Sequence, residues 1–197
     1  EESDATHLGI FDIPMISNIP NLVYLAPTNK EEYFKMLDWG LNQTGHPVAI
    51  RVPVVDVVST GEEDKTDYSI LNKYKVTKKG KDVAIIALSN FYNLGKEIAD
   101  ELGDVTLINP VYITGLDEEL LEKLKENHKL VITLEDSVLD GGFGEKVSRF
   151  YGTSDVKVKN YGIKKSFPDR FDVEEFLMEN GISKEQIITD IKELLEK

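Results

Sequence analysis

The sequence predicts a doubly wound α/β fold with a mostly parallel sheet, on the basis of three observations. Short apolar runs typical of buried strands recur along the chain. Between them lie stretches whose apolar residues repeat at helical spacing, and turn residues separate the two kinds of segment. Because a helix must carry the chain back across a sheet face before the next parallel strand, this alternation indicates helices on both faces of one sheet.

The first predicted unit begins with a strand and a helix. Residues 22–26 form an apolar run that Pro27 closes. The tetrad Thr-Asn-Lys-Glu at residues 28–31 matches a capping box, in which the side chains of the first and last residues bond to each other's backbone amides. We therefore expect a helix over residues 29–43. Its predicted apolar face consists of Phe34, Leu37 and Leu41.

A second strand at residues 48–50 completes this unit, which ends at Arg51. Two strands and one helix bury too little apolar surface to be stable alone, so we expect residues 1–58 to be the C-terminal part of a larger domain. Residues 59–66 are polar and have no period, and they are predicted to form a linker. Residues 67–197 are predicted to form the second domain, with the doubly wound sheet.

A regular alternation of apolar runs and amphipathic stretches predicts the elements of this second domain. Strands are expected over residues 83–88, 105–108, 130–134 and 156–158. Helices are expected over residues 91–102, from residue 117, over residues 144–151 and from residue 183, where Ser-Lys-Glu-Gln forms another capping box.

The composition favours a globular protein of the cytoplasm. Hydrophobic residues make up 41% of the chain and charged residues 30%, proportions typical of folded domains. The formal net charge of -13 argues against binding to nucleic-acid phosphates, which takes clustered Lys and Arg. No apolar run reaches the roughly 20 residues of a membrane span. Without cysteine the chain forms no disulfide and no thiolate metal site.

The three histidines are the first candidates for proton transfer. His7 lies on a predicted loop and leads, because an imidazole with a pKa of about 6.5 exchanges protons near neutrality. The alternative for His7 is a surface residue of a frayed terminus. His46, in a Gly-His-Pro turn, is predicted to be structural. His128 is also predicted to be structural, as a cation at the C-terminus of a helix.

A second candidate lies where a predicted strand ends in Glu135 and Asp136, because α/β sheets bind ligands at the carboxyl ends of their strands. The loop Asp-Gly-Gly-Phe-Gly at residues 140–144 follows and opens a helix, which indicates either an anion cradle or, more simply, a tight connection or subunit contact. No H-E-x-x-H metal motif and no G-x-S-x-G nucleophile motif is present.

Several segments together resemble one known family. They are Asp4-Ala-Thr-His-Leu-Gly-Ile-Phe-Asp12, Ile19-Pro20, Ala26-Pro27, Val48-Ala-Ile-Arg51 with Pro53, Leu116-Asp117, Leu134-Glu135 and Gly141-Gly-Phe-Gly144. In this order they resemble 1-deoxy-D-xylulose-5-phosphate synthase, of the transketolase-like, thiamine-diphosphate-dependent group. The Thr-His-x-Gly-x-Phe-Asp motif is fairly specific, whereas the Gly-Gly-x-Gly loop is shared with transketolases and with β subunits of 2-oxo-acid dehydrogenases. The similarity runs through nearly all of this chain but covers only the last third of such an enzyme.

The resemblance implies an architecture, a reaction and partners. Residues 1–58 would end the pyrimidine-binding domain, and residues 67–197 would form the transketolase C-terminal domain, which supports a homodimer. The small-molecule substrates would be pyruvate and glyceraldehyde 3-phosphate, condensed to 1-deoxyxylulose 5-phosphate with release of carbon dioxide. Thiamine diphosphate and Mg²⁺ would be the cofactors, bound mainly by residues upstream of this chain. We therefore expect this chain to be a fragment that is inactive by itself.

The resemblance also implies site residues. The histidine of the motif lines the substrate pocket in the family, so His7 inherits a catalytic role, and Ser3, Asp4 and Arg51 are predicted on the substrate side. The family commonly has an Asp four residues before the histidine, where this chain has Ser3, with Asp4 displaced by one. It also has an Arg after the proline of its Arg-x-Pro segment, where Val54 stands here, and this weakens the expectation of a phosphorylated acceptor. Arg51 is not expected to replace that Arg, because three residues along a strand reverse the direction of a side chain.

Three functional hypotheses follow. In the first, the chain is part of a thiamine-dependent synthase or of a close transketolase-like relative. In the second, it is a transketolase or 2-oxo-acid dehydrogenase β-like interaction module that pairs with a separate catalytic chain. In the third, it is an α/β domain without a catalytic role, as the missing Asp and Arg would favour. Covalent linkage to an upstream segment separates the first two, and the activity of a His7→Ala variant tests the third.

Overall fold

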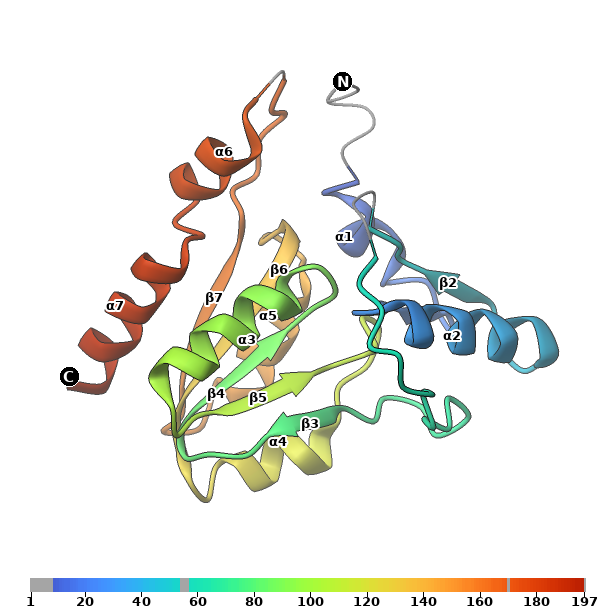
Figure 1. Ribbon diagram of the computed structural model, residues 1–197, viewed down its shortest axis with the longest axis horizontal. Helices are drawn as coiled ribbons and strands as arrows, with labels where there is room; N and C mark the ends of the chain where they lie inside the picture. Colours follow the sequence, from blue (N-terminus) through green and yellow to red (C-terminus); the bar gives the residue numbers. More distant parts are fainter. Residues whose placement is uncertain (1–8, 54–56, 170, 197) are drawn as a thin grey trace.

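The computed structural model describes residues 9–53, 57–169 and 171–196 and shows an α/β fold (Figure 1). A five-stranded sheet carries helices on both faces, and a two-stranded parallel sheet lies beside it. In Figure 1 the segment with β1, β2 and α2 lies on one side of the five-stranded sheet, and α6 and α7 lie on the other. The predicted fold class is confirmed. In the part of the chain that the structure covers, no helix is both long and apolar enough to span a membrane.

The strands are β1 (Val23–Leu25), β2 (Val48–Ile50), β3 (Lys75–Lys78), β4 (Asp82–Ala87), β5 (Thr106–Asn109), β6 (His128–Val138) and β7 (Lys157–Ile163). The helices are α1 (Asp12–Ile16), α2 (Lys30–Asn42), α3 (Phe91–Leu102), α4 (Glu118–Leu124), α5 (Phe143–Tyr151), α6 (Val173–Glu179) and α7 (Lys184–Glu196).

The five-stranded sheet has the order β3-β5-β4-β6-β7. β4 is parallel to β5 and β6, and β7 is parallel to β6, whereas β3 is antiparallel to β5 at the edge. Ile85 on β4 pairs with Leu107 on one side and with Ile132 on the other. Residues 83–88 are all buried. Because both faces of this central strand are covered, its sequence is continuously apolar rather than alternating.

Helices cover both faces of this sheet, as a doubly wound fold requires. α3 and α7 pack on one face, where Ile187 shares an apolar cluster with Ile85. α4 and α5 pack on the other face, where Val147 shares a second cluster with Ile86. Neighbouring residues of β4 therefore point into opposite cores, as the two-residue period of a strand dictates.

The N-terminal segment packs directly against the five-stranded sheet. Ile13 of α1 and Tyr24 of β1 belong to the same apolar cluster as Ile86 of β4. The Ile113 amide, after β5, donates a hydrogen bond to the Tyr24 carbonyl at 2.8 Å. The residues on either side of the predicted linker thus share one buried core, which fixes the position of β1 relative to the larger sheet.

The predicted linker, residues 59–66, bonds to the first turn of α2. The Glu31 carboxylate accepts hydrogen bonds from the amides of Thr60 and Gly61, at 3.0 and 3.3 Å, and from the Ser59 hydroxyl. The bonds from Ser59 and Thr60 lower the pKa of Glu31 to about 2. The division of the chain into residues 1–58, 59–66 and 67–197 stays a prediction.

The capping box of α2 lies one residue later than predicted. Asn29, not Thr28, is the N-cap, and its side chain accepts a hydrogen bond from the Glu32 amide at 2.8 Å. Glu32, not Glu31, bonds back, accepting from the Thr28 amide and hydroxyl at 2.9 Å each. The physical reason is that Glu32 is buried and also binds the Lys75 ammonium at 2.7 Å, which fixes that residue inward.

Of the predicted apolar face of α2, Leu37 is half-buried, but the other two residues face solvent. Phe34 is 55% exposed and Leu41 is 77% exposed, whereas Met36 is fully buried. Met36 packs in a cluster with Tyr68, and Trp39 lies against the same cluster. Glu32 and Met36 lie four residues apart and therefore on the same side of α2, and their burial turns Phe34 and Leu41 toward solvent.

The sequence predicted neither β3, α1 nor α6, and it predicted β6 and β7 too short. β3 is a four-residue edge strand that begins and ends with lysine, a composition that hinders pairing with other sheets and weakens the strand pattern. β6 continues through Glu135 and Asp136, because the Phe143 amide donates a hydrogen bond to Glu135 and the Asn90 side chain donates one to Asp136. Polar residues with such partners sit inside a strand without cost in unsatisfied hydrogen bonds.

His128 opens β6 and is buried. Its Nδ1 lies 3.0 Å from the Leu124 carbonyl at the end of α4, and its Nε2 lies 2.8 Å from the Thr106 hydroxyl. Burial lowers the pKa of His128, so the neutral imidazole is favoured. The predicted place beside a helix C-terminus is confirmed by the contact with the Leu124 carbonyl, and burial disfavours the predicted positive charge against the effects of Leu124 and Asp82.

Candidate functional site

Most of the predicted site residues lie outside the described residues. These are His7, Ser3 and Asp4. Arg51 is described and directly follows β2. Gly9 is the first described residue and follows His7 by two positions in the sequence. The surroundings of Gly9 and Arg51 are therefore the part of the predicted site that can be built from geometry.

The Arg51 guanidinium joins three parts of the chain. Its Nε donates to Asp12 Oδ2 at 2.6 Å, and its Nη2 donates to the Gly9 carbonyl at 3.0 Å. Its Nη1 donates to the Asp136 carboxylate at the end of β6. The Arg51 side chain is only 12% exposed. Its rigid fork of donors is thus directed at acceptors of the protein itself, a geometry suited to binding two carboxylates.

Neutral side chains complete the shell around the two carboxylates. The Tyr24 hydroxyl donates to Asp12 Oδ2 at 2.5 Å, and the Asn90 side-chain amide donates to Asp136 Oδ2 at 3.0 Å. Burial raises the pKa of Tyr24, and the hydrogen bond to Asp12 raises it further, so the hydroxyl stays a donor. We call this set the Arg51 cluster; it consists of Gly9, Asp12, Tyr24, Arg51, Asn90 and Asp136.

The residues that follow His7 are tied to β6 as well. The Ile10 carbonyl accepts a hydrogen bond from the Val138 amide at 2.9 Å and another from the Ser137 hydroxyl at 2.8 Å. Gly9 has a φ of +57°, a conformation that glycine adopts without the strain other residues would carry. Hydrogen bonds from Arg51 to Gly9 and from β6 to Ile10 therefore fix the position of these two residues.

Sequence reasoning found part of the Arg51 cluster. Asp12 was visible as the last residue of the Thr-His-x-Gly-x-Phe-Asp motif, and Asp136 as an acid at a strand end. Neither Tyr24 nor Asn90 stood out, because a tyrosine in a strand and an asparagine before a helix are common structural residues. Only the folded chain shows that Asp12 and Asp136 meet at Arg51 and that Tyr24 and Asn90 donate to these two carboxylates.

The loop of residues 141–144 cradles an anion, and that anion belongs to the protein. The amides of Phe143 and Gly144 donate to the two carboxylate oxygens of Glu135, at 2.8 and 2.7 Å. The Gly142 amide donates to the Leu139 carbonyl at 3.0 Å. The geometry thus supports the tight connection that the sequence left as an alternative to a ligand cradle.

Glu135 is fully buried beneath this loop. Burial raises the pKa of Glu135 to about 7, against the effect of the Gly144 and Phe143 amides, which lower it. A shifted pKa often marks a functional group. Here the two amide bonds give the carboxylate a structural task, namely to fix the first turn of α5 to β6.

Gly142→Ala is expected to destabilise the protein by about 2 kcal/mol, because overpacking a filled site costs on the order of 1–3 kcal/mol. A Cβ at this position would lie 2.6 Å from Glu135 Oε2 and 2.7 Å from the Val138 carbonyl oxygen. Urea unfolding of the variant measures the loss. Gly152→Ala is the matched control: its nearest neighbour would be the Arg149 carbonyl oxygen at 3.5 Å, so a change within about 0.5 kcal/mol is expected. Equal effects of the two substitutions would contradict the tight packing of the loop.

The described residues do not fit a metal or a diphosphate. They contain no group of three or more His, Cys, Asp and Glu side chains placed to hold a metal ion. The paired carboxylates of Asp12 and Asp136 are bound by Arg51, and the amides of Phe143 and Gly144 are bound by Glu135. At the Arg51 cluster and at the loop of residues 141–144, the groups that could hold Mg²⁺ or a diphosphate are thus already used within the fold.

Comparisons with known proteins agree with this architecture. Residues 72–187 match the family described as transketolase, C-terminal domain. The chain is 34% identical over 204 residues to 1-deoxy-D-xylulose-5-phosphate synthase from Carboxydothermus hydrogenoformans, covering 100% of this chain and 32% of that protein. It is 32% identical to the synthase from Clostridium tetani, covering 98% of this chain and again 32% of that protein. The chain thus spans about a third of the length of these relatives.

A solved structure gives a similar result for the fold. The compared structure is described as a split gene transketolase in an inactive beta4 tetramer. This chain superposes on it with a TM-score of 0.79 at 22% sequence identity. The match covers 98% of this chain and 64% of that chain. At this identity the likeness concerns the fold alone, and it includes both the two-stranded and the five-stranded sheet.

Proposed function

This chain belongs to the transketolase C-terminal domain family, and from that premise we propose that it forms the C-terminal part of a thiamine-diphosphate-dependent transferase. The proposed reaction is that of 1-deoxy-D-xylulose-5-phosphate synthase, the condensation of pyruvate with glyceraldehyde 3-phosphate and release of carbon dioxide. The identity of 34% and 32% to two such synthases, over nearly the whole chain, supports this choice. The Thr-His-x-Gly-x-Phe-Asp motif around His7 supports it as well.

In this proposal His7 is the catalytic residue that the chain contributes, with Ser3 and Asp4 on the substrate side. The observation that carries the proposal is the Arg51 cluster, which binds Gly9, two positions after His7 in the sequence. A side chain that binds substrate needs rigid structural support, because small errors in its position strongly lower the rate of catalysis. Arg51 was predicted on the substrate side, and its contacts with Asp12 and Asp136 support instead the proposal that it positions the segment after His7.

Thiamine diphosphate and Mg²⁺ are proposed to be held by other parts of the complete enzyme. The reason is that the α5 amides and the paired carboxylates of Asp12 and Asp136, which could otherwise bind these groups, have partners within the fold. By itself, the 197-residue chain is therefore expected to show no turnover with pyruvate and glyceraldehyde 3-phosphate when the cofactors are added.

A second candidate is a subunit of a split transketolase that pairs with a separate catalytic chain. It is favoured by the superposition of 98% of this chain on a protein described as a split gene transketolase. Intact mass of the native gene product separates the two candidates, since only the synthase proposal requires a longer chain. The synthase is proposed to be a homodimer, whereas the split-transketolase subunit is proposed to assemble with its separate catalytic chain.

The acceptor substrate is expected to depend on Val54, a residue outside the described ranges. An uncharged side chain there offers no bidentate partner for a phosphate, unlike an arginine. An unphosphorylated aldehyde is therefore the alternative acceptor, and comparing the rates with glyceraldehyde and with glyceraldehyde 3-phosphate distinguishes the two.

His7→Ala in the gene product that contains this chain tests the proposal. Loss of a general acid or base lowers kcat/KM by roughly 100-fold or more, and that is the expected result for pyruvate-dependent release of carbon dioxide. His46→Ala is the control, because His46 lies in the turn after α2 and is expected to leave the rate unchanged. If His7→Ala also kept the parent rate, His7 would have no catalytic role, and the domain would be a structural one.

A further inference from the structure

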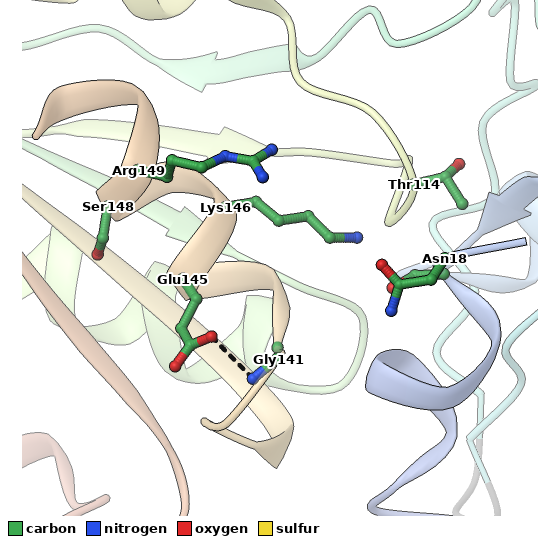
Figure 2. Close-up of a pocket in the computed structure, with 9 residues that line it drawn as sticks. Asn18, Thr114, Gly141, Glu145, Lys146, Ser148 and Arg149 are labelled. Atoms are coloured by element: carbon green, nitrogen blue, oxygen red, sulfur yellow. Dashed lines mark hydrogen bonds between the residues drawn. The ribbon is translucent and has the colours of Figure 1, made fainter. Parts of the chain in front are cut away.

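A pocket of about 500 Å³ lies between the end of α1 and the outer face of α5 (Figure 2). Its volume falls in the range of about 300–1,000 Å³ that is typical of small-molecule sites. From α5 and the preceding loop it is lined by Gly141, Gly142, Glu145, Lys146, Ser148 and Arg149. From the opposite side it is lined by Ser17, Asn18 and Thr114.

Two cations face this pocket without a carboxylate partner. Neither Lys146 nor Arg149 forms an ion pair within residues 9–53, 57–169 and 171–196. In Figure 2 the Lys146 side chain extends across the pocket toward Asn18 and Thr114. Glu145, the carboxylate of the lining, instead accepts a hydrogen bond from the Gly141 amide at 2.8 Å. The chain carries a net charge of -13, so acidic residues outnumber basic ones, and two neighbouring cations without a carboxylate partner are unusual in it.

Lys146 is buried more than a solvated lysine would be. Its Nζ donates to the Ile113 carbonyl at 3.0 Å, which leaves further N–H donors of the ammonium free. Burial lowers the pKa of Lys146 to about 8, and the nearby Arg149 lowers it too, while Glu135 raises it. The ammonium is thus still mostly charged at pH 7. No carboxylate of the described residues forms an ion pair with it, so a bound anion would offset part of the cost of its burial.

We propose that this pocket binds a small phosphate monoester. A phosphate dianion matches the two positive charges of Lys146 and Arg149, and its oxygens accept both ammonium and guanidinium hydrogens. The hydroxyls of Thr114 and Ser148 each accept one hydrogen bond from the protein, from the Tyr24 amide and the Asn160 side chain, and each keeps its O–H to donate to the hydroxyls of a short polyol attached to that phosphate. The first amides of α5 play no part, because Glu135 already binds those of Phe143 and Gly144.

Calorimetric titration of the purified chain with inorganic phosphate and with glycerol 3-phosphate tests this site, with glycerol and succinate for comparison. Both phosphates are expected to bind, succinate more weakly and glycerol not at all. Lys146→Met and Arg149→Gln are each expected to weaken phosphate binding about tenfold, the effect of one charge-assisted hydrogen bond. Lys192→Gln removes the same charge from an exposed position of α7, on the opposite face of the sheet, and is expected to leave binding unchanged.

Several results would overturn the proposal. One is unchanged affinity in both pocket variants, and another is an equal loss in Lys192→Gln, which would mean a general charge effect. Tighter binding of succinate than of phosphate would overturn the assigned ligand class. Arg149 is exposed, so Arg149→Gln is expected to keep the fold. If thermal melting shows that Lys146→Met is unfolded, the phosphate affinity of Arg149→Gln tests the proposal. None of these results bears on His7, whose test is separate.

Discussion

Replacing Arg51 by methionine is expected to lower the free energy of unfolding by about 4 kcal/mol. The reason is that Asp12 and Asp136 would keep their negative charges while losing the guanidinium that binds both. Removing one partner of a largely buried ion pair costs roughly 3–5 kcal/mol, because an uncompensated charge stays behind. Urea unfolding followed by circular dichroism measures the change.

Arg149→Met is the matched control for this prediction. Arg149 is exposed and has no carboxylate partner among the described residues, so the same change in charge and size is expected to alter stability by no more than about 0.5 kcal/mol. A double variant, Arg51→Met with Asp136→Asn, is expected to lose at least about 1 kcal/mol less than the sum of the single losses, since contacting residues couple. A loss below about 1 kcal/mol for Arg51→Met alone would refute the structural weight given to this cluster.

Glu135 is expected to make the stability of the protein depend on pH. Burial raises its pKa to about 7, from an ordinary value of 4.5. Between these values the folded protein binds a proton that the unfolded chain has released, so the contribution of Glu135 is fully present below pH 4.5 and is lost as the pH rises through 7. At 1.36 kcal/mol per pKa unit, the loss amounts to about 3 kcal/mol.

Comparison with Glu135→Gln isolates this effect. The amide does not titrate, so the stability of the parent relative to the variant is expected to fall by about 3 kcal/mol from pH 4.5 to pH 8. His128, whose lowered pKa acts in the opposite direction, is present in both proteins and cancels in the difference. Glu135→Ala is expected to show the same slope with a larger constant loss, because it also removes both acceptors of the α5 amides. A difference that stays constant with pH would contradict the raised pKa.

The sequence predicted the sheet better than the ends of its elements. The helix over residues 91–102 lies as predicted, and the strand predicted over residues 83–88 is displaced by one residue, because each has a clear apolar pattern and clear end residues. α2 failed at its cap, since Thr28 and Asn29 are both good N-caps and only the buried bonds of Glu32 select between them. The edge strand β3 has too few apolar residues to be seen without its neighbour β5.

In the candidate site too, some residues could be predicted from the sequence and others only from the fold. A local motif brought out His7 and, with it, Asp12, because the motif lies within one short stretch of sequence. The Arg51 cluster joins residues as far apart as 51 and 136, and no local pattern links them. The same holds for the phosphate pocket, where Lys146 and Thr114 come from different elements. Such sites depend on which side chains the fold brings together.

Local chemistry alone decided which segments of this protein are strands and helices and how they alternate, because hydrophobic periods and turn residues act over a few positions. The three-dimensional packing decided which charges are neutralised and which stay free. Arg51 and Glu135 find partners inside the fold, while Lys146 and Arg149 face a cavity. The reason is that desolvation and charge pairing depend on distances in space, which the chain sets only when the N-terminal segment closes on the sheet.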